Sequence, residues 1–378
     1  MENTSAKTRN AGLDLLRIVA MCMIVVLHYL GKGNLLADMS KADSWTTTNI
    51  VAWFLESVCV VAVNLYMLTS GYLLSAQTPK LSRLFSLYIQ LWVYSFGIGM
   101  LAQAFNLVPA KENDFYHLLI TLLPVSMVHY WYITAYFFLY LLLPLLSIAV
   151  KKMTRKQHLA CTILLIFFVT VLKSVLPVVL ENDNEGYDFL WYIVLFLVAA
   201  YIRKYNPKFA SVKVCIPLYL IGLFGSFFET LVLGKVCEKT GSLTLILHIA
   251  MHYNHIFPLL ASVGLFGLFI KIKINGVASK IISFVAPLTL GVYLLHENMR
   301  VRYLWPNWLG ADKVSGIGSL LWHTAIAILV VFVLGIVVEF IRSKLFGLID
   351  KGFMFIPPYK KLKELIKKVD LIFAEEKN

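Results

Sequence analysis

Two ionisable residues of the first apolar segment, Arg17 and His28, have types and a spacing that suit catalysis. In a helix, eleven residues make about three turns plus 20°, so both side chains project from one face. The axial distance between them is about 16 Å. A guanidinium binds phosphate oxygens through paired donors, and an imidazole accepts protons near neutral pH. The pair therefore predicts anion binding at one depth and proton transfer at another.

Each of these residues also has an alternative structural role. Arg17 can extend its charged head to the lipid headgroups, and His28 can be a hydrogen-bonded packing histidine. Ionisable side chains are rare in hydrocarbon because burial there costs several kcal/mol, and those that occur are usually functional. Because Arg17 and His28 share a helix face, two independent structural roles are the weaker interpretation.

The composition indicates what kind of protein must position this pair. The chain has 378 residues, of which 59% are hydrophobic and 15% charged, against about 45–50% and about 25% in soluble proteins. We therefore expect an all-α, polytopic membrane protein with about ten transmembrane helices. The apolar segments of suitable length lie at about 13–31, 49–75, 84–107, 130–150, 158–180, 189–203, 212–234, 254–271, 281–299 and 318–341.

The distribution of charge predicts the orientation of these segments. A net charge of +13 can indicate a nucleic-acid partner, but most of the 34 Lys and Arg residues lie in alternate loops. This pattern follows the positive-inside rule and excludes a nucleic-acid-binding protein. Both chain termini are thereby predicted to be cytoplasmic. The apolar stretch 115–124 is too short to cross and is expected to form a half-helix or an interfacial helix.

The chain divides into a transmembrane domain, 1–344, and a cytoplasmic tail, 345–378. Within the tail, 359–373 places its apolar residues on one helical face and lysines on the other. This pattern is typical of a basic amphipathic helix on an anionic membrane surface, so membrane lipids are expected partners. A soluble helical tail is the alternative.

Four segments resemble, in order, motifs of the acyltransferase-3 family of integral-membrane O-acyltransferases. Arg17, ten residues and His28 resemble the Arg-x10-His signature of its first helix. The segment NLYMLTSGYLL (64–74) resembles the aromatic-rich segment of the family that ends Ser-Gly-aromatic. The segments YWYITAYFFLYLLLPLL (130–146) and GVYLLHE (291–297) resemble its aromatic Leu-Pro segment and its late Tyr-Leu-x-His motif.

This resemblance covers about residues 11–341 and implies a function. It implies transfer of an acyl group, commonly acetyl, from cytoplasmic acyl-coenzyme A to a hydroxyl of an extracytoplasmic glycan or lipid-linked sugar. The expected location is the plasma membrane of a bacterium. Arg17 and His28 correspond to the motif positions, with His28 as the expected catalytic base and Arg17 as a contact of coenzyme A. Acyl-coenzyme A is a co-substrate, so no permanently bound cofactor is expected.

Other residues are candidates because of their expected depth. Glu56 is expected about 10 Å below the outer surface, near His28, where its carboxylate would orient the imidazole as a second catalytic residue. A hydrogen-bonded packing role is the alternative for Glu56.

On the inner side, the small residues Ser70 and Gly71 are expected to let a ligand approach the backbone closely. Ser70, Lys80 and Arg83 are expected to contact coenzyme A, with Lys80 and Arg83 binding its phosphates. Positive-inside topology alone also accounts for these two basic residues.

At the outer side, His255, His296 and Glu297 are the expected acceptor-binding residues. A plain helix-end cap is the alternative for His296 and Glu297. His248, His252 and His255 are spaced four and three apart, which also suits a metal site if the segment is helical. No HExxH pattern accompanies them, so we expect no bound metal and favour contact with a sugar.

The alternative from another functional class is a secondary transporter of a polar metabolite or a lipid-linked sugar. Such a protein would also have charges inside the membrane and a two-sided cavity. Transporters often consist of two related halves, and this sequence shows no such symmetry. Its charged residues also lie at two depths and not around one midplane site. Binding of coenzyme A distinguishes the acyltransferase from the transporter.

Overall fold

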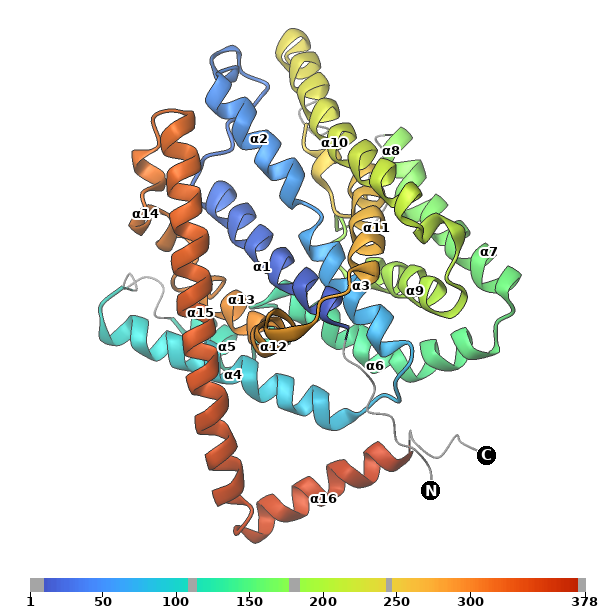
Figure 1. Cartoon of the computed structure of the whole chain (residues 1–378). Helices are drawn as coiled ribbons and strands as arrows, with labels where there is room; N and C mark the ends of the chain where they lie inside the picture. Colours follow the sequence, from blue (N-terminus) through green and yellow to red (C-terminus); the bar gives the residue numbers. More distant parts are fainter. Residues whose placement is uncertain (1–9, 108–113, 177–183, 243–246, 373–378) are drawn as a thin grey trace.

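The computed structural model describes residues 10–107, 114–176, 184–242 and 247–372, and it contains no strand within them. The all-α class predicted from the composition is therefore confirmed. The helices, labelled as in Figure 1, are α1 (Ala11–Lys32), α2 (Thr47–Cys59), α3 (Ala62–Leu74), α4 (Leu81–Ala104), α5 (Phe115–Leu122), α6 (Trp131–Lys152), α7 (Arg155–Ile166), α8 (Leu172–Val175), α9 (Phe189–Tyr205), α10 (Val212–Thr240), α11 (Ile256–Lys271), α12 (Gly276–Val285), α13 (Thr289–His296), α14 (Trp305–Trp308), α15 (Ile317–Phe353) and α16 (Pro357–Ile372).

In the described part of the chain, nine helical segments are long and apolar enough to cross a membrane. They correspond to nine of the ten predicted spans, which confirms a polytopic membrane protein. The remaining prediction, 189–203, falls on α9, which has 17 residues. Almost the whole of α9 is buried, from Trp191 to Ile202. The apolar side chains of α9 are therefore explained by its position in the centre of the bundle. There the helix contacts α3, α6 and α7.

Helix α1 lies in the interior of the bundle, and this position follows from its sequence. The Asn10 side chain accepts a hydrogen bond from the Leu13 N–H and begins the helix. Both faces of the following segment are apolar, so the helix packs on several sides. It contacts α2, α3, α11, α13 and α15, and in Figure 1 it lies between α15 and α11. The two candidate residues of α1 are therefore presented to several neighbouring helices.

The small residues near the end of α3 have separate structural positions. A Cβ atom on Gly71 would lie 3.0 Å from the Phe196 Cα of α9. Gly71 therefore allows α3 and α9 to approach closely, whereas we expected the Ser70–Gly71 pair to make room for a ligand. Of these two residues, only Ser70 can still contact a ligand as predicted.

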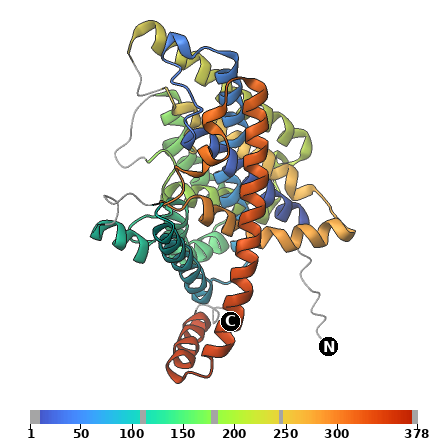
Figure 2. The ribbon, with the colours of Figure 1, turned by 90° about the vertical axis from the view of Figure 1, so that its left-hand side faces the viewer.

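The C-terminal part consists of α15 and α16, which meet at an angle below the bundle (Figure 2). Helix α15 continues through 344–345, where the sequence suggested the division between membrane domain and tail. Helix α16 packs against the start of α4. There the Asp370 carboxylate accepts hydrogen bonds from the Ser82 N–H and hydroxyl, at 3.1 and 2.6 Å. Since Ser82 lies in the first turn of α4, Asp370 satisfies an otherwise free donor of that helix.

Candidate active site

A cavity of about 350 Å³ lies between α1, α3, α4, α6 and α13. It brings together three residues that the sequence assigned to coenzyme A, namely Arg17, Ser70 and Arg83. Most of its remaining lining is aromatic or aliphatic, including Tyr132 and Tyr136. The cavity thus combines two guanidinium groups with an apolar wall.

Lys80, the fourth predicted contact, is not among the residues that line this cavity. Its backbone N–H and carbonyl both bond to the Tyr140 hydroxyl, at 3.1 and 3.0 Å. Tyr140 does line the cavity, so Lys80 lies beside the mouth. The exposed Lys80 side chain is therefore placed to add positive charge near the cavity without being part of its wall.

Arg17 is held loosely within the cavity. Its side chain is 26% exposed, and its closest ion pair among the described residues is a 3.8 Å contact with Asp14. The Tyr66 hydroxyl donates to the Arg17 carbonyl oxygen at 2.8 Å, which ties α3 to α1 at this level. Because a guanidinium has five N–H donors, Arg17 retains donors for a ligand in the cavity.

A second, smaller cavity of about 30 Å³ contains His28. It shares Tyr66, Tyr132 and Leu290 with the first cavity, so the two hollows adjoin. Trp131 and other aromatic residues complete its lining. The shared helix face predicted for Arg17 and His28 therefore leads to two adjacent hollows, one at each depth.

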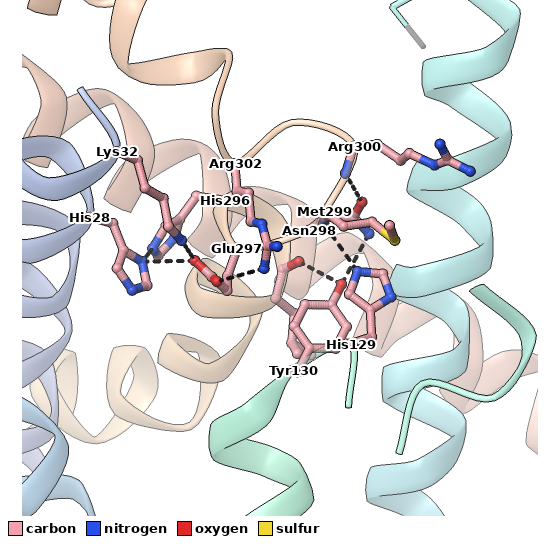
Figure 3. A network of polar contacts seen from close by, with 11 residues as sticks. His28, Lys32, His129, Tyr130, His296, Glu297, Asn298, Met299, Arg300 and Arg302 are labelled. Carbon is pink, nitrogen blue, oxygen red and sulfur yellow. Dashed lines mark hydrogen bonds and ion pairs between the residues drawn. The ribbon is translucent and has the colours of Figure 1, made fainter. Parts of the chain in front are cut away.

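His28 belongs to a polar network that joins α1 to the end of α13 (Figure 3). Its Nδ1 atom lies 2.9 Å from Nε2 of His296 and 3.1 Å from Oε2 of Glu297. Nδ1 of His296 lies 2.6 Å from the carbonyl oxygen of Val292. Two of the three predicted acceptor-binding residues thus contact the predicted catalytic base directly.

These contacts assign the proton positions of both imidazoles. The Val292 carbonyl can only accept a hydrogen bond, so Nδ1 of His296 carries a proton and Nε2 of the neutral ring accepts. Nδ1 of His28 faces two acceptors, His296 Nε2 and the Glu297 carboxylate, and therefore carries the proton on its own ring. Nε2 of a neutral His28 is then the unprotonated nitrogen. In this tautomer Nε2 is the ring atom of His28 whose lone pair can take a proton.

Glu297 is buried, with 3% of the residue exposed, and three nitrogen-containing side chains surround its carboxylate. Besides His28, it forms an ion pair with Lys32 and contacts Nη1 of Arg302 at 3.5 Å. Neither Lys32 nor Arg302 was among the site residues predicted from the sequence. One signal was present, because Lys32 follows His28 by four residues and must share its helix face.

The loop after α13 that carries Arg302 is anchored by His129. Nε2 of His129 accepts a hydrogen bond from the Met299 N–H at 3.1 Å, and its Nδ1 lies 2.8 Å from the Ser95 hydroxyl oxygen. That hydroxyl donates to the Thr121 carbonyl, so Nδ1 of His129 must be the donor to Ser95. Burial, with the positive charges of Arg302 and then Arg300, lowers the pKa of His129 to about 4.

Glu56 does not occupy the position that we expected. It forms no hydrogen bond or ion pair with His28 in the described part of the chain, and its Oε2 atom is buried without a hydrogen-bond partner. Glu297 is the carboxylate that contacts the imidazole. The expected depth of Glu56 did not place it beside His28, because depth alone does not say which way a side chain faces.

His255, the third predicted acceptor residue, also lies apart from His296 and Glu297. Its Nε2 atom is 3.6 Å from Oε2 of Glu229 on α10. The other two histidines of that segment have different neighbours: His248 stacks on Trp53, and His252 lies 3.4 Å from Glu185. No group of three or more His, Cys, Asp or Glu residues suited to a metal occurs within the described ranges.

Comparison with known protein families gives one finding that covers most of the chain. A family model described as an acyltransferase domain, that of the acyltransferase-3 family, matches residues 10–341. The match includes both cavities and the whole His28 network. Comparison with curated proteins and with solved structures gives no match.

Proposed function

The chain belongs to the acyltransferase-3 family and is a membrane acyltransferase, and on this premise we propose its reaction. It transfers an acyl group, most simply acetyl, from cytoplasmic acyl-coenzyme A to a hydroxyl of an extracytoplasmic glycan or lipid-linked sugar. The proposed location is a bacterial plasma membrane. The observation that carries this proposal is the pair of adjacent cavities, one containing Arg17 and the other His28.

The larger cavity is the proposed site of the acyl-coenzyme A arm. Its tyrosine and aliphatic walls suit a slender, weakly polar chain, while Arg17, Ser70 and Arg83 offer donors to carbonyl and phosphate oxygens. Lys80 adds positive charge at the mouth. A hydrophilic nucleotide enters from the side rich in basic loops, which the positive-inside rule identifies as cytoplasmic. Only the acyl end has to reach the level of His28, about 16 Å from Arg17.

His28 is the proposed general base. Its Nε2 atom takes the proton of the acceptor hydroxyl while the hydroxyl oxygen attacks the thioester carbonyl. The new C–O bond forms, and the C–S bond then breaks to release the thiolate of coenzyme A. The imidazolium returns its proton to that thiolate, so the protein ends the cycle unchanged. Acyl transfer by this route balances without any further reactant.

Glu297 and His296 are the proposed positioning residues of the base. A carboxylate beside Nδ1 stabilises the positive charge that develops on His28, and His296 fixes the ring with a second acceptor. Lys32 and Arg302 form ion pairs with the same carboxylate and help to hold it beside His28. Glu297 and His296 therefore act through His28 in this mechanism, which replaces the acceptor-binding role expected of them. His255 remains a candidate acceptor contact on the outer side.

Sealed membrane vesicles of known orientation test this proposal. Vesicles from cells that produce the wild type or His28→Ala receive radiolabelled acetyl-coenzyme A on one face, and label in envelope glycans and lipid-linked sugars is measured. We expect incorporation only when the cytoplasmic face is accessible, and a loss of about 10²–10⁴-fold in His28→Ala with acetyl-coenzyme A binding retained.

Two results would contradict the proposal. Equal incorporation by wild type and His28→Ala would remove His28 from the chemistry. Failure of the wild type to bind acetyl-coenzyme A, together with uptake of a labelled sugar, would favour the transporter alternative.

A further inference from the structure

A groove of about 410 Å³ lies between α4 and α15, separate from the His28 cavity. It shares Arg83 and Leu87 with the cavity that contains Arg17, so the two hollows join at Arg83. All of its lining residues except Leu87 are polar or charged. They are Ser82, Arg83, Ser86, Leu87, Gln90 and Arg342.

The Arg342 side chain is held in place by a buried carboxylate. Glu339, 3% exposed, accepts the Nε–H and Nη2–H groups of Arg342 at 2.8 and 2.6 Å. Tyr94 and Gln90 donate to the same carboxylate at 2.8 and 3.1 Å. Since a guanidinium has five N–H donors, Arg342 retains three while its orientation is already fixed. A fixed guanidinium loses little side-chain entropy when it binds an anion.

The surroundings of the groove contain an excess of basic residues. Helix α16, which packs against α4 beside Ser82, has five lysines and two acidic residues. Both carboxylate oxygens of one of these acids, Asp370, already accept hydrogen bonds from Ser82. Lys80 precedes α4 at the same end. An anionic ligand therefore meets net positive charge as it approaches the groove.

We propose that this groove binds the nucleotide phosphates of acyl-coenzyme A, with Arg342 as a phosphate-binding residue. The inference rests on the proposed function and extends it. Coenzyme A has a slender arm at one end and an anionic nucleotide at the other. The two hollows differ in the same way, because one is mainly apolar and the other is polar and basic. The arm fits the aromatic and aliphatic cavity, and the phosphates fit the guanidinium, hydroxyl and amide groups of the groove. Arg83 lies at the junction of the two parts.

The phosphate of an anionic phospholipid has the same chemistry as a nucleotide phosphate, so the experiment separates the two sources. Full-length protein in detergent is titrated with coenzyme A and with pantetheine, which has the arm but no phosphate. Arg342→Ala should weaken coenzyme A binding about tenfold, because charge-assisted hydrogen bonds to phosphate oxygens are lost. The affinity for pantetheine should stay as in wild type. Lys344→Ala, an exposed cation on the same helix outside the groove, should change neither affinity.

Arg342→Ala leaves Glu339 buried without its ion pair, so Arg342→Lys is the second variant. Lysine retains a positive charge beside Glu339 but not the planar fork, and it too should weaken binding of coenzyme A selectively. Equal coenzyme A affinity in wild type and both variants would overturn the inference. Loss of co-purified anionic phospholipid from Arg342→Ala with unchanged coenzyme A affinity would also overturn it. A wild type that binds neither coenzyme A nor pantetheine would instead refute the proposed function.

Discussion

Nδ1 of His28 lies 2.9 Å from Nε2 of His296, although 268 positions of sequence separate the two residues. The contact joins the end of α1 to the end of α13 and places the catalytic candidate between a histidine and a carboxylate. Because the Val292 carbonyl fixes the proton of His296 on its Nδ1, the contact also determines which nitrogen of His28 is free to act as a base.

We expect His296→Ala to lower kcat about 10²-fold, because the ring of His28 loses one of the two acceptors that orient it. The KM for acyl-coenzyme A should stay as in wild type, since His296 does not line the cavity that contains Arg17. Steady-state kinetics on detergent-purified protein measure both quantities. A parallel loss of kcat and coenzyme A affinity would indicate a general folding defect and not a positioning role.

Glu297→Gln and Glu56→Gln form a matched pair of variants. They test whether a carboxylate matters for the transfer rate because it contacts His28 or because it lies at a similar depth in the membrane. Glu297→Gln should lower the transfer rate about 10²-fold, because the amide cannot stabilise the charged form of His28. Glu56→Gln should have little effect on the rate, because Glu56 forms no hydrogen bond or ion pair with His28 among the described residues. Both variants are compared by transfer rate at equal coenzyme A occupancy. A large defect in Glu56→Gln alone would restore Glu56 as the orienting carboxylate.

Arg17→Lys should weaken coenzyme A binding about tenfold, and Arg17→Ala at least as much. A lysine ammonium is a point charge and does not reproduce the paired donors of a guanidinium on a phosphate or carbonyl oxygen. Equilibrium binding of coenzyme A to the full-length protein measures the change. If both variants bind coenzyme A as tightly as wild type, Arg17 is an anchor to the lipid headgroups.

The stability of the protein should fall as the pH decreases from about 6.5 towards 4, with His129 as one cause. In the folded protein the pKa of His129 is lowered to about 4, while an unfolded chain protonates this residue near its ordinary value of about 6.5. The unfolded state therefore binds the extra proton first, and the contribution lost is roughly 3 kcal/mol at most. Protonation of Nε2 would also break its hydrogen bond with the Met299 N–H.

The thermal midpoint in detergent, measured between pH 7 and pH 4.5, tests this expectation. His129→Gln cannot titrate in this range and should show a smaller decrease than wild type. His117 on α5, whose side chain is 20% exposed and contacts Asp114, supplies the control, because His117→Gln should leave the contribution of His129 unchanged. Identical pH dependence in wild type and His129→Gln would show that other groups cause the loss.

The sequence alone determined the class of the protein, most of its membrane spans, and the relation between Arg17 and His28. Each of these follows from local rules: apolar length predicts a span, and the helical repeat predicts which residues of one helix share a face. Motif resemblance supplied the family, which the match over residues 10–341 shows. The inner cavity lining also agrees with three of the four residues assigned to coenzyme A, while their role stays a prediction.

Only the tertiary structure decided which residues surround His28. Depth along the membrane normal can be estimated from the sequence, and it favoured Glu56 as the carboxylate beside His28, with Glu297 assigned to acceptor binding. The direction in which each side chain faces depends on how whole helices pack, and the end of α13 packs beside α1 so that Glu297 and His296 meet the imidazole. The same packing places α9 directly against Gly71, and it places Arg83 and Arg342 in the lining of one groove. Contacts between distant segments arise from the combined burial of many side chains, which local periodicity does not encode.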